Sequence, residues 1–152
     1  MNLHVKSLDK LNPEELPNFF DSLDYSHAPH WSGCYCRFYH EDDTDIDWTQ
    51  RDAQLNRSET IEAIKNEEMN GFIVYDDEKA VGWLNAQSVE RFKRLIPVFS
   101  QYYNQKYALS ICFVIHPEYR NKGLATFLLD YAINTYKALG YKGMLALPPK
   151  EK

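Results

Sequence analysis

The stretch His116-Pro-Glu-Tyr-Arg-Asn-Lys-Gly-Leu-Ala-Thr-Phe-Leu-Leu129 decides the fold, because it joins two segments of different periodicity. The preceding run, Leu109-Ser-Ile-Cys-Phe-Val-Ile115, is short and mostly apolar, as in a buried strand. After Gly123, apolar groups recur every three or four residues until Gly140, which predicts an amphipathic helix with a glycine after its C-terminus. The apolar positions of this predicted helix are Leu124, Leu128, Tyr131, Ala132, Thr135 (through its methyl group) and Leu139.

The turn between this strand and this helix has the composition of an anion site. The first N–H groups of a helix lack intrahelical partners and lie at the positive end of the helix dipole, where anions bind. Gly123 would let a phosphate approach the main chain, and Ala125 keeps the first helical turn narrow. Arg120 and Lys122 add positive charge. The glycine spacing fits neither the Walker phosphate loop nor the dinucleotide fingerprint, so the sequence supports neither nucleotide fold.

The pattern Arg120-x-x-Gly123-x-Ala125, after a strand ending Phe113-Val-Ile-His-Pro117, resembles the coenzyme A signature Gln/Arg-x-x-Gly-x-Gly/Ala of the GNAT superfamily of N-acetyltransferases. The predicted order of elements also resembles that family up to its fifth strand. The resemblance implies one domain over residues 1–152, of α+β class in three layers. Its central sheet would be mixed and mainly antiparallel, flanked by helices, as in acyl-CoA N-acyltransferases. Because the family continues into another helix and two more strands, we expect a domain that is incomplete at its C-terminus. Either the sequence is a fragment of a longer protein, or a second copy completes the sheet as a homodimer, or the protein dispenses with the missing elements.

The same resemblance implies the ligands and the site. Acetyl-CoA would be the co-substrate, and a primary amine of a small molecule or protein would be the acceptor. The backbone of Phe113, Val114 and Ile115 would hold the pantetheine arm, with the Val114 N–H at a strand bulge as oxyanion donor. The cofactor's pyrophosphate would be bound by Arg120, Asn121, Lys122, Gly123, Leu124, Ala125 and Thr126.

The general base is not assigned by this resemblance. Some family members have a glutamate early in the fourth strand, and this sequence has Leu109 there. An enzyme therefore needs a water chain or another residue to take the proton of the amine. The alternative is a protein that binds acyl-CoA without turnover and acts as a sensor or interaction module.

Two residues of a predicted hairpin are candidates for binding the acceptor. Asn85 shares a strand face with Val81 and Trp83 if the strand is regular, so its amide either points into the acceptor cleft or bonds to backbone at the sheet edge. Trp83 either lines the same cleft or belongs to the core.

The remaining elements follow from periodicity and from turn and cap residues. Pro17 is expected to kink or delay the first helix, and Ser58 to cap the second of two helical pieces after Trp48. The expected elements are, in chain order, a strand Leu3–Ser7, a helix starting near Asn12–Glu15, a strand within Trp31–His40, helices between Trp48 and Asn70, a hairpin of Gly71–Tyr75 and Ala80–Ala86, a short helix Ser88–Leu95, a strand Tyr107–Ile115 and a last strand Tyr141–Leu147.

Composition and metal-ligand spacing exclude other classes. The 17 basic and 22 acidic residues give a formal charge of -5, which argues against nucleic-acid binding. Cys34-x-Cys36 with His40 is short of zinc ligands, and the acids Asp43, Asp45 and Asp47 fail the calcium-loop pattern, so we expect no metal. No window is long and apolar enough for a membrane span, and the 3 cysteines suggest no disulfide framework. We expect a cytoplasmic protein without membrane partners.

Overall fold

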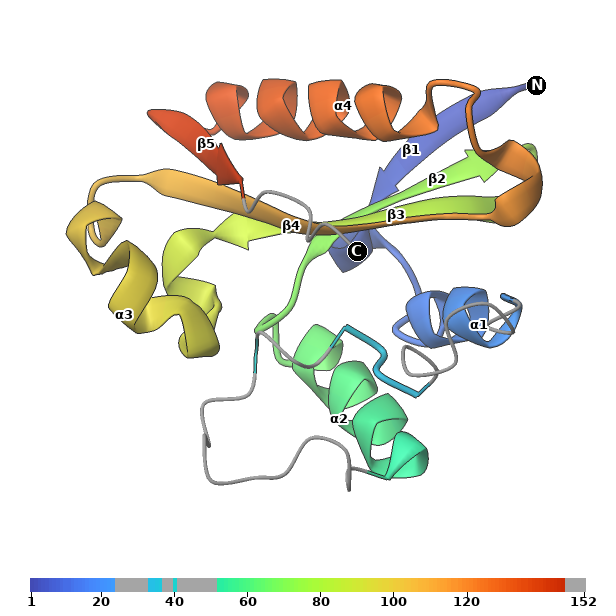
Figure 1. Cartoon of the computed structure of the whole chain (residues 1–152), viewed down its shortest axis with the longest axis horizontal. Coiled ribbons are helices and arrows are strands. Elements are labelled where there is room, and N and C mark those ends of the chain that lie inside the picture. Colours follow the sequence, from blue (N-terminus) through green and yellow to red (C-terminus); the bar gives the residue numbers. More distant parts are fainter. Residues whose placement is uncertain (24–32, 37–39, 41–51, 147–152) are drawn as a thin grey trace.

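A computed structural model of the chain describes residues 1–23, 33–36, 40 and 52–146. Its centre is a 5-stranded sheet in the order β1-β2-β3-β4-β5 (Figure 1). The neighbours β1 to β4 pair antiparallel, and β5 pairs parallel to β4, so the predicted mixed, mainly antiparallel sheet is confirmed. The strands are β1 (Leu3–Ser7), β2 (Gly71–Asp76), β3 (Lys79–Ser88), β4 (Tyr107–Ile115) and β5 (Gly143–Ala146).

Helices cover both faces of the sheet (Figure 1). The longest, α4, crosses one face, and α1, α2 and α3 lie on the other, which we call the lower face. The α-helices are α1 (Glu15–Asp21), α2 (Ala53–Lys65), α3 (Ile96–Phe99) and α4 (Leu124–Ala138). Short 3-10 turns are Leu8–Lys10, Val89–Arg91, Lys93–Leu95, Ser100–Tyr102 and Pro117–Tyr119.

Each face of the sheet has its own core because side chains alternate along a strand. The α4 face is filled by a stripe of one buried residue per helical turn, which packs on β2 and β3; the stripe is Leu124, Leu128, Ala132 and Tyr136. The lower face buries Trp83 and Ile73 against Leu16 and Phe19 of α1 and Ala63 of α2. The sheet therefore separates two hydrophobic layers, and the predicted three-layer α+β class is confirmed.

The helix that begins after Gly123 is confirmed, but two of its predicted apolar positions are exposed: Tyr131 is 43% exposed, and Leu139 lies past the end of the helix. Gly140 has φ +87°, as expected for a glycine that follows a helix. Leu139, predicted as an apolar position, is 59% exposed because it lies beyond the last helical residue. Its place in the buried stripe is taken by Tyr136, whose hydroxyl donates to the Ala86 carbonyl at 2.9 Å and so satisfies its polar group.

The strand predicted within Trp31–His40 is wrong where the structure describes it. Gly33, Tyr35 and Cys36 have φ of +80°, +50° and +62°, which is a turn and not extended backbone. The amide of Asn56 donates to the Gly33 carbonyl at 2.8 Å, and the Thr60 hydroxyl donates to the Tyr35 carbonyl at 2.9 Å. Helix α2 thus holds this turn under the sheet. Residues 31–32 and 37–39 of that prediction lie outside the described residues.

Other predicted boundaries are confirmed or corrected locally. Asp52, and not Ser58, caps α2: its carboxylate accepts from the Gln54 N–H at 3.0 Å, whereas the Ser58 hydroxyl donates inside the helix to the Gln54 carbonyl. Helix α1 begins at Glu15, so Pro17 falls in its first turn, where no N–H is needed. The helix expected over Ser88–Leu95 is a pair of 3-10 turns. The acidic segment 41–47 and Leu147 lie outside the described residues.

Candidate active site

Strand β4 is paired on both sides for only half of its length. β3 pairs with β4 from Ala108 to Ile115, but β5 pairs only with Tyr107 to Ser110. Among the described residues, no strand pairs with the outer edge of residues 111–115. This open half of β4 leads directly into the connection that precedes α4 (Figure 1). An extended ligand could therefore add to the sheet here as a further strand would.

A bulge marks the point where the open half of β4 begins. Leu84 pairs with Phe113 and Ala86 pairs with Ser110, so two residues, Ile111 and Cys112, oppose the single residue Asn85. A bulge bends a strand and sharpens its twist, which turns the open half of β4 away from β5. The bulge that the sequence resemblance implied is thus present, two residues before Val114.

The register also fixes which backbone groups face the open edge. The His116 N–H donates to the Val81 carbonyl at 2.8 Å, so His116 is directed toward β3. Backbone groups alternate in direction along an antiparallel strand, so Val114 also faces β3, as its pairing with Trp83 requires. The N–H groups of Phe113 and Ile115 therefore point to the open edge.

The connection after β4 leaves the start of α4 without a side-chain cap. Gly123 occupies the N-cap position with φ +80°, and no atom lies within 4 Å of the place where its Cβ would be. Asn121 also has positive φ, +61°, a conformation that asparagine tolerates better than most residues. Leu124 is buried under the helix, and Asn121, Lys122, Ala125 and Thr126 are exposed. The first N–H groups of α4 are thus accessible from solvent, as an anion site requires.

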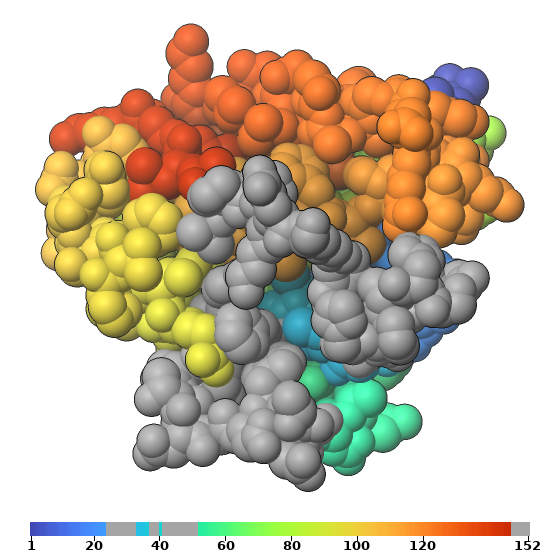
Figure 2. All heavy atoms as spheres, in the orientation of Figure 1, coloured from blue at the N-terminus to red at the C-terminus, as the bar shows by residue number. Residues whose placement is uncertain are grey.

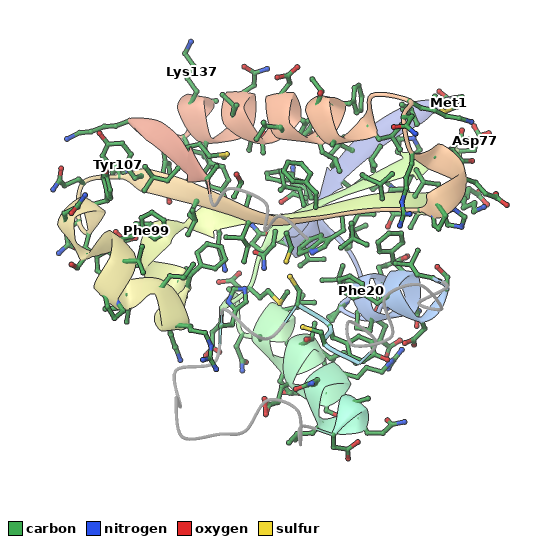
Figure 3. All side chains as sticks on the ribbon, in the orientation of Figure 1. Met1, Phe20, Asp77, Phe99, Tyr107 and Lys137 are labelled. Atoms are coloured by element: carbon green, nitrogen blue, oxygen red, sulfur yellow. The ribbon has the colours of Figure 1, made fainter. Side chains whose placement is uncertain are left out.

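Tyr119 anchors this connection to the β2–β3 hairpin. Its hydroxyl donates to Asp76 Oδ2 at 2.7 Å, and this hydrogen bond is the main reason why the pKa of Asp76 is lowered. The ammonium groups of Lys79 and Lys122 each lie 5.5 Å from the centre of the Tyr119 ring. Asp77 in Figure 3 marks the hairpin at the same end of the sheet as the connection. In the space-filling view the connection and α4 form one continuous surface (Figure 2).

The acceptor candidates Asn85 and Trp83 lie on the lower face, under β3. Trp83 is fully buried, and its ring lies against Gly71, where a Cβ would come within 2.4 Å of a ring carbon. Val81 belongs to the opposite core because a β2–β3 irregularity breaks the alternation that the sequence predicted. Asn85 is also fully buried, and its bonds go to side chains and not to backbone at a sheet edge.

Asn85 belongs to a buried polar cluster whose members lie far apart in the sequence. Its Nδ2 lies 3.1 Å from Cys36 Sγ and 3.0 Å from His40 Nε2. The Cys112 thiol is hydrogen-bonded to the Cys36 side chain, and this hydrogen bond together with burial raises the pKa of Cys112. From the sequence, Cys36 and His40 are candidates only as metal ligands, and Cys112 has no predicted role. Among the described residues no group of three or more His, Cys, Asp or Glu is arranged to hold a metal ion.

The structure therefore places the predicted cofactor residues along one strand edge and the turn that follows it, whereas the acceptor candidates Asn85 and Trp83 are fully buried under β3. The backbone N–H groups of Phe113 and Ile115 lie on the open edge of β4, and residues 120–126 form the turn that follows this strand. An open strand edge can pair with an extended amide-containing arm, and an uncapped helix start can bind a phosphate group, so this combination suits a ligand that has both.

Comparison with known proteins identifies the class. A model of the acetyltransferase (GNAT) family matches residues 20–150, and the chain belongs to that family. No curated protein matches the chain significantly. No described helix is long and apolar enough to cross a membrane.

Solved structures share the fold at low sequence identity. One is an aminoglycoside acetyltransferase, meta-AAC0020, from an uncultured soil metagenomic sample, in complex with sisomicin: 15% identity, 97% of this chain and 78% of that chain covered, TM-score 0.55. Another is a ribosomal-protein-alanine N-acetyltransferase from Brucella melitensis biovar Abortus 2308, with 11% identity, 97% and 81% coverage and a TM-score of 0.57. A third is the aminoglycoside N-acetyltransferase AAC(6')-Iy in complex with CoA, with 14% identity, 97% and 78% coverage and a TM-score of 0.54.

Proposed function

We propose that this chain is an acetyl-CoA-dependent N-acetyltransferase that transfers an acetyl group to a primary amine of a small molecule or a protein. The observation that carries the proposal is the continuity of the open edge of β4 with the uncapped N-terminus of α4. One ligand with an amide-containing arm and a diphosphate would occupy both. Membership of the acetyltransferase family and the CoA complex of one structural neighbour support the same ligand.

In this proposal the arm and the diphosphate of acetyl-CoA have separate partners. Main-chain groups of Phe113 and Ile115 bind the pantetheine amides along the open edge, as an added strand would. The diphosphate lies on the N–H groups of residues 121–126, with Arg120 and Lys122 as nearby cations. Gly123 fits this role because the space beside its Cα is open.

The backbone donor for the thioester oxygen is best sought at the bulge. Val114 was the candidate from the sequence, but its N–H is directed into the β3 ladder by the register. The Phe113 N–H is the first after the bulge that faces the open edge. We therefore favour Phe113 over Val114 as the oxyanion donor.

A non-catalytic acyl-CoA sensor is the second candidate. It is favoured by Leu109, which is fully buried at the position where some family members have a glutamate base. Such a sensor would bind CoA and become more stable, but it would not release thiol.

The proposal extends to location and partners. Cys34, Cys36 and Cys112 are thiols that form no disulfide, which supports a reducing cytoplasm. The net acidic charge supports small-molecule or protein acceptors over nucleic acid. The outer edge of β5 pairs with no described strand, which supports a homodimer that extends the sheet.

The deciding experiment measures thiol release from acetyl-CoA with a panel of primary amines, alongside calorimetric titration with CoA. The panel contains aminoglycosides, polyamines, free amino acids and peptides with a free N-terminus. An enzyme binds CoA and releases thiol in an amine-dependent manner. Binding of CoA without thiol release for any amine of the panel supports the sensor. No heat on titration with CoA rejects both the acetyltransferase and the sensor.

A further inference from the structure

The turn in which we place the diphosphate has few contacts of its own. Within the part of the chain that the structure describes, no acceptor bonds to the backbone N–H groups of residues 121–126. Only Leu124 of this stretch is buried, so side-chain packing does not hold the other residues. Asn121 and Gly123 also adopt positive φ, +61° and +80°. A turn of this kind needs a contact outside itself if it is to keep one shape before the ligand binds.

Tyr119, just before this stretch, supplies such a contact. Its ring packs against the hydrophobic core on the α4 face, and the His116 ring meets it edge-on with centroids 5.8 Å apart. Its hydroxyl donates to Asp76 Oδ2 at 2.7 Å. This hydrogen bond is the main reason why the pKa of Tyr119 is raised, so the phenol stays protonated and remains a donor at neutral pH.

Asp76 is itself held by the sheet and by the start of the chain. It is the last residue of β2, and it pairs with Leu3 of β1 and Lys79 of β3. Its second oxygen, Oδ1, accepts from the Asn2 N–H at 2.9 Å. The side-chain amide of Asn2 donates to the neighbouring carboxylate, Asp77 Oδ1, also at 2.9 Å. The carboxylate that receives the Tyr119 hydroxyl therefore belongs to the sheet and not to a free loop.

The Tyr119 ring also attracts the cation of the exposed turn. The ammonium group of Lys122 lies 5.5 Å from the ring centre, and the ammonium group of Lys79 lies at the same distance. A cation above an aromatic ring is attracted by the negative face of the ring. A lysine side chain otherwise samples many rotamers, so this contact reduces the order that has to be imposed when a phosphate binds.

We propose that Tyr119 and Asp76 are positioning residues of the CoA site. Asp76 fixes the Tyr119 hydroxyl, and Tyr119 holds the turn and Lys122 in the arrangement that receives the diphosphate. This inference rests on the proposed acetyl-CoA-dependent function. Neither residue contacts the ligand in this proposal, so the β2–β3 hairpin sets the affinity for CoA from outside the diphosphate site.

The sign of the effect at Asp76 separates positioning from simple electrostatics. A carboxylate near a diphosphate repels it, so charge alone predicts tighter CoA binding when Asp76 is removed. Positioning predicts the opposite, because Tyr119 loses its acceptor. Asp76→Ala should therefore raise the Kd for CoA about fivefold, and Asp76→Asn should lose less affinity because its amide oxygen can still accept from Tyr119. Unchanged or tighter CoA binding in Asp76→Ala would overturn the proposal.

Tyr119→Phe keeps the packed ring and removes only the hydroxyl. Calorimetric titration should show a Kd for CoA that is raised about fivefold to tenfold. Binding of pantetheine, which has no diphosphate, should be unchanged in a chemical-shift titration. Tyr75→Phe is the matched control, because the Tyr75 hydroxyl also donates to a carboxylate, Glu15 Oε2 at 3.4 Å, and its Kd for CoA should stay that of the wild type. Equal weakening for CoA and pantetheine, or no weakening for CoA, would refute the positioning role.

Nuclear magnetic resonance of the free chain tests the Lys122 contact without any ligand. Protons above an aromatic ring are shifted upfield, so the ε-methylene signal of Lys122 should be upfield in the wild type and in Tyr119→Phe. It should return to its ordinary position in Tyr119→Leu, whereas the signal of Lys65, which pairs with Glu62, should stay in place. An unshifted Lys122 signal in the wild type would show that the ring does not hold this cation.

The titrations distinguish failure of this inference from failure of the proposed function. If the wild-type chain binds CoA and Tyr119→Phe binds it equally well, the positioning role is rejected and the proposed function stands. If the wild-type chain gives no heat with CoA, the proposed function is rejected, and the positioning role is rejected with it.

Discussion

At the scale of single residues, two glycines flank the same helix and offer a matched comparison. Gly123 and Gly140 have φ of +80° and +87°, and neither has an atom within 4 Å of the place of a Cβ. Alanine at either position should therefore cost similar stability through the left-handed backbone alone, about 1 kcal/mol. Only Gly123 lies where we place the diphosphate.

We predict that Gly123→Ala weakens CoA binding at least about tenfold, equivalent to about 1.4 kcal/mol, because the new methyl group occupies the space of a phosphate oxygen. Gly140→Ala should show a similar loss of Tm with an unchanged Kd. Calorimetric titration with CoA and thermal unfolding of both variants measure the two effects. Equal Kd values for the two variants would place the diphosphate elsewhere.

At the scale of elements, α4 is held on the sheet by its buried stripe and not by its whole apolar surface. Leu128 is fully buried against β2 and β3, whereas Leu139 is 59% exposed. We predict that Leu128→Ala lowers the free energy of unfolding by about 2–5 kcal/mol, because it removes buried methyl groups and leaves a cavity. Leu139→Ala should change it by less than about 0.5 kcal/mol. Urea unfolding of both variants checks this, and similar losses would contradict the packing of α4.

The elements that the sequence predicted well are those whose signal is local. The strand over Leu3–Ser7, the hairpin of Gly71–Tyr75 and Ala80–Ala86 and the helix after Gly123 each carry a local apolar pattern with a turn or cap residue at the end. The failures come from interactions between distant residues. Alternation in residues 33–36 suggested a strand, but hydrogen bonds from Asn56 and Thr60 of α2 hold that segment as a turn.

The features of the candidate site divide in the same way between local and long-range signals. The turn at 120–126 is a local motif, so its residues could be read from the sequence. The bulge at Ile111 and Cys112 is a property of the β3–β4 pairing, and the register of this pairing decides which N–H groups of β4 face outward. The contact of Asn85 with Cys36 and His40 joins residues 49 and 45 positions apart. No local pattern could have shown that His40 lies beside the bulge.

At the scale of the whole molecule, β4 pairs with β5 over only part of its length and so keeps an open edge, along which we place the arm of acetyl-CoA. The sheet lies between the lower layer of helices and the α4 layer (Figure 1), so an arm paired with the open edge of β4 would be continuous with the sheet. Such a ligand would act as a sixth strand. Its hydrogen bonds would then reach every second residue of β4 and no others.

This geometry predicts an alternating pattern of amide protection when CoA binds. With acetyl-CoA bound, the N–H groups of Phe113 and Ile115 should exchange with solvent more slowly, because they face the open edge and gain acceptors: the thioester oxygen for Phe113 and a pantetheine carbonyl for Ile115. The N–H of Val114 should change little, because the β3 ladder already uses it in the free protein. Residues 121–126 should be protected with Phe113 and Ile115 if one ligand spans both parts of the site. Hydrogen exchange resolved to single amides measures this pattern, and protection centred on Val114 would show that the register of β4, and with it the placement of the acyl group, is different from the one inferred here.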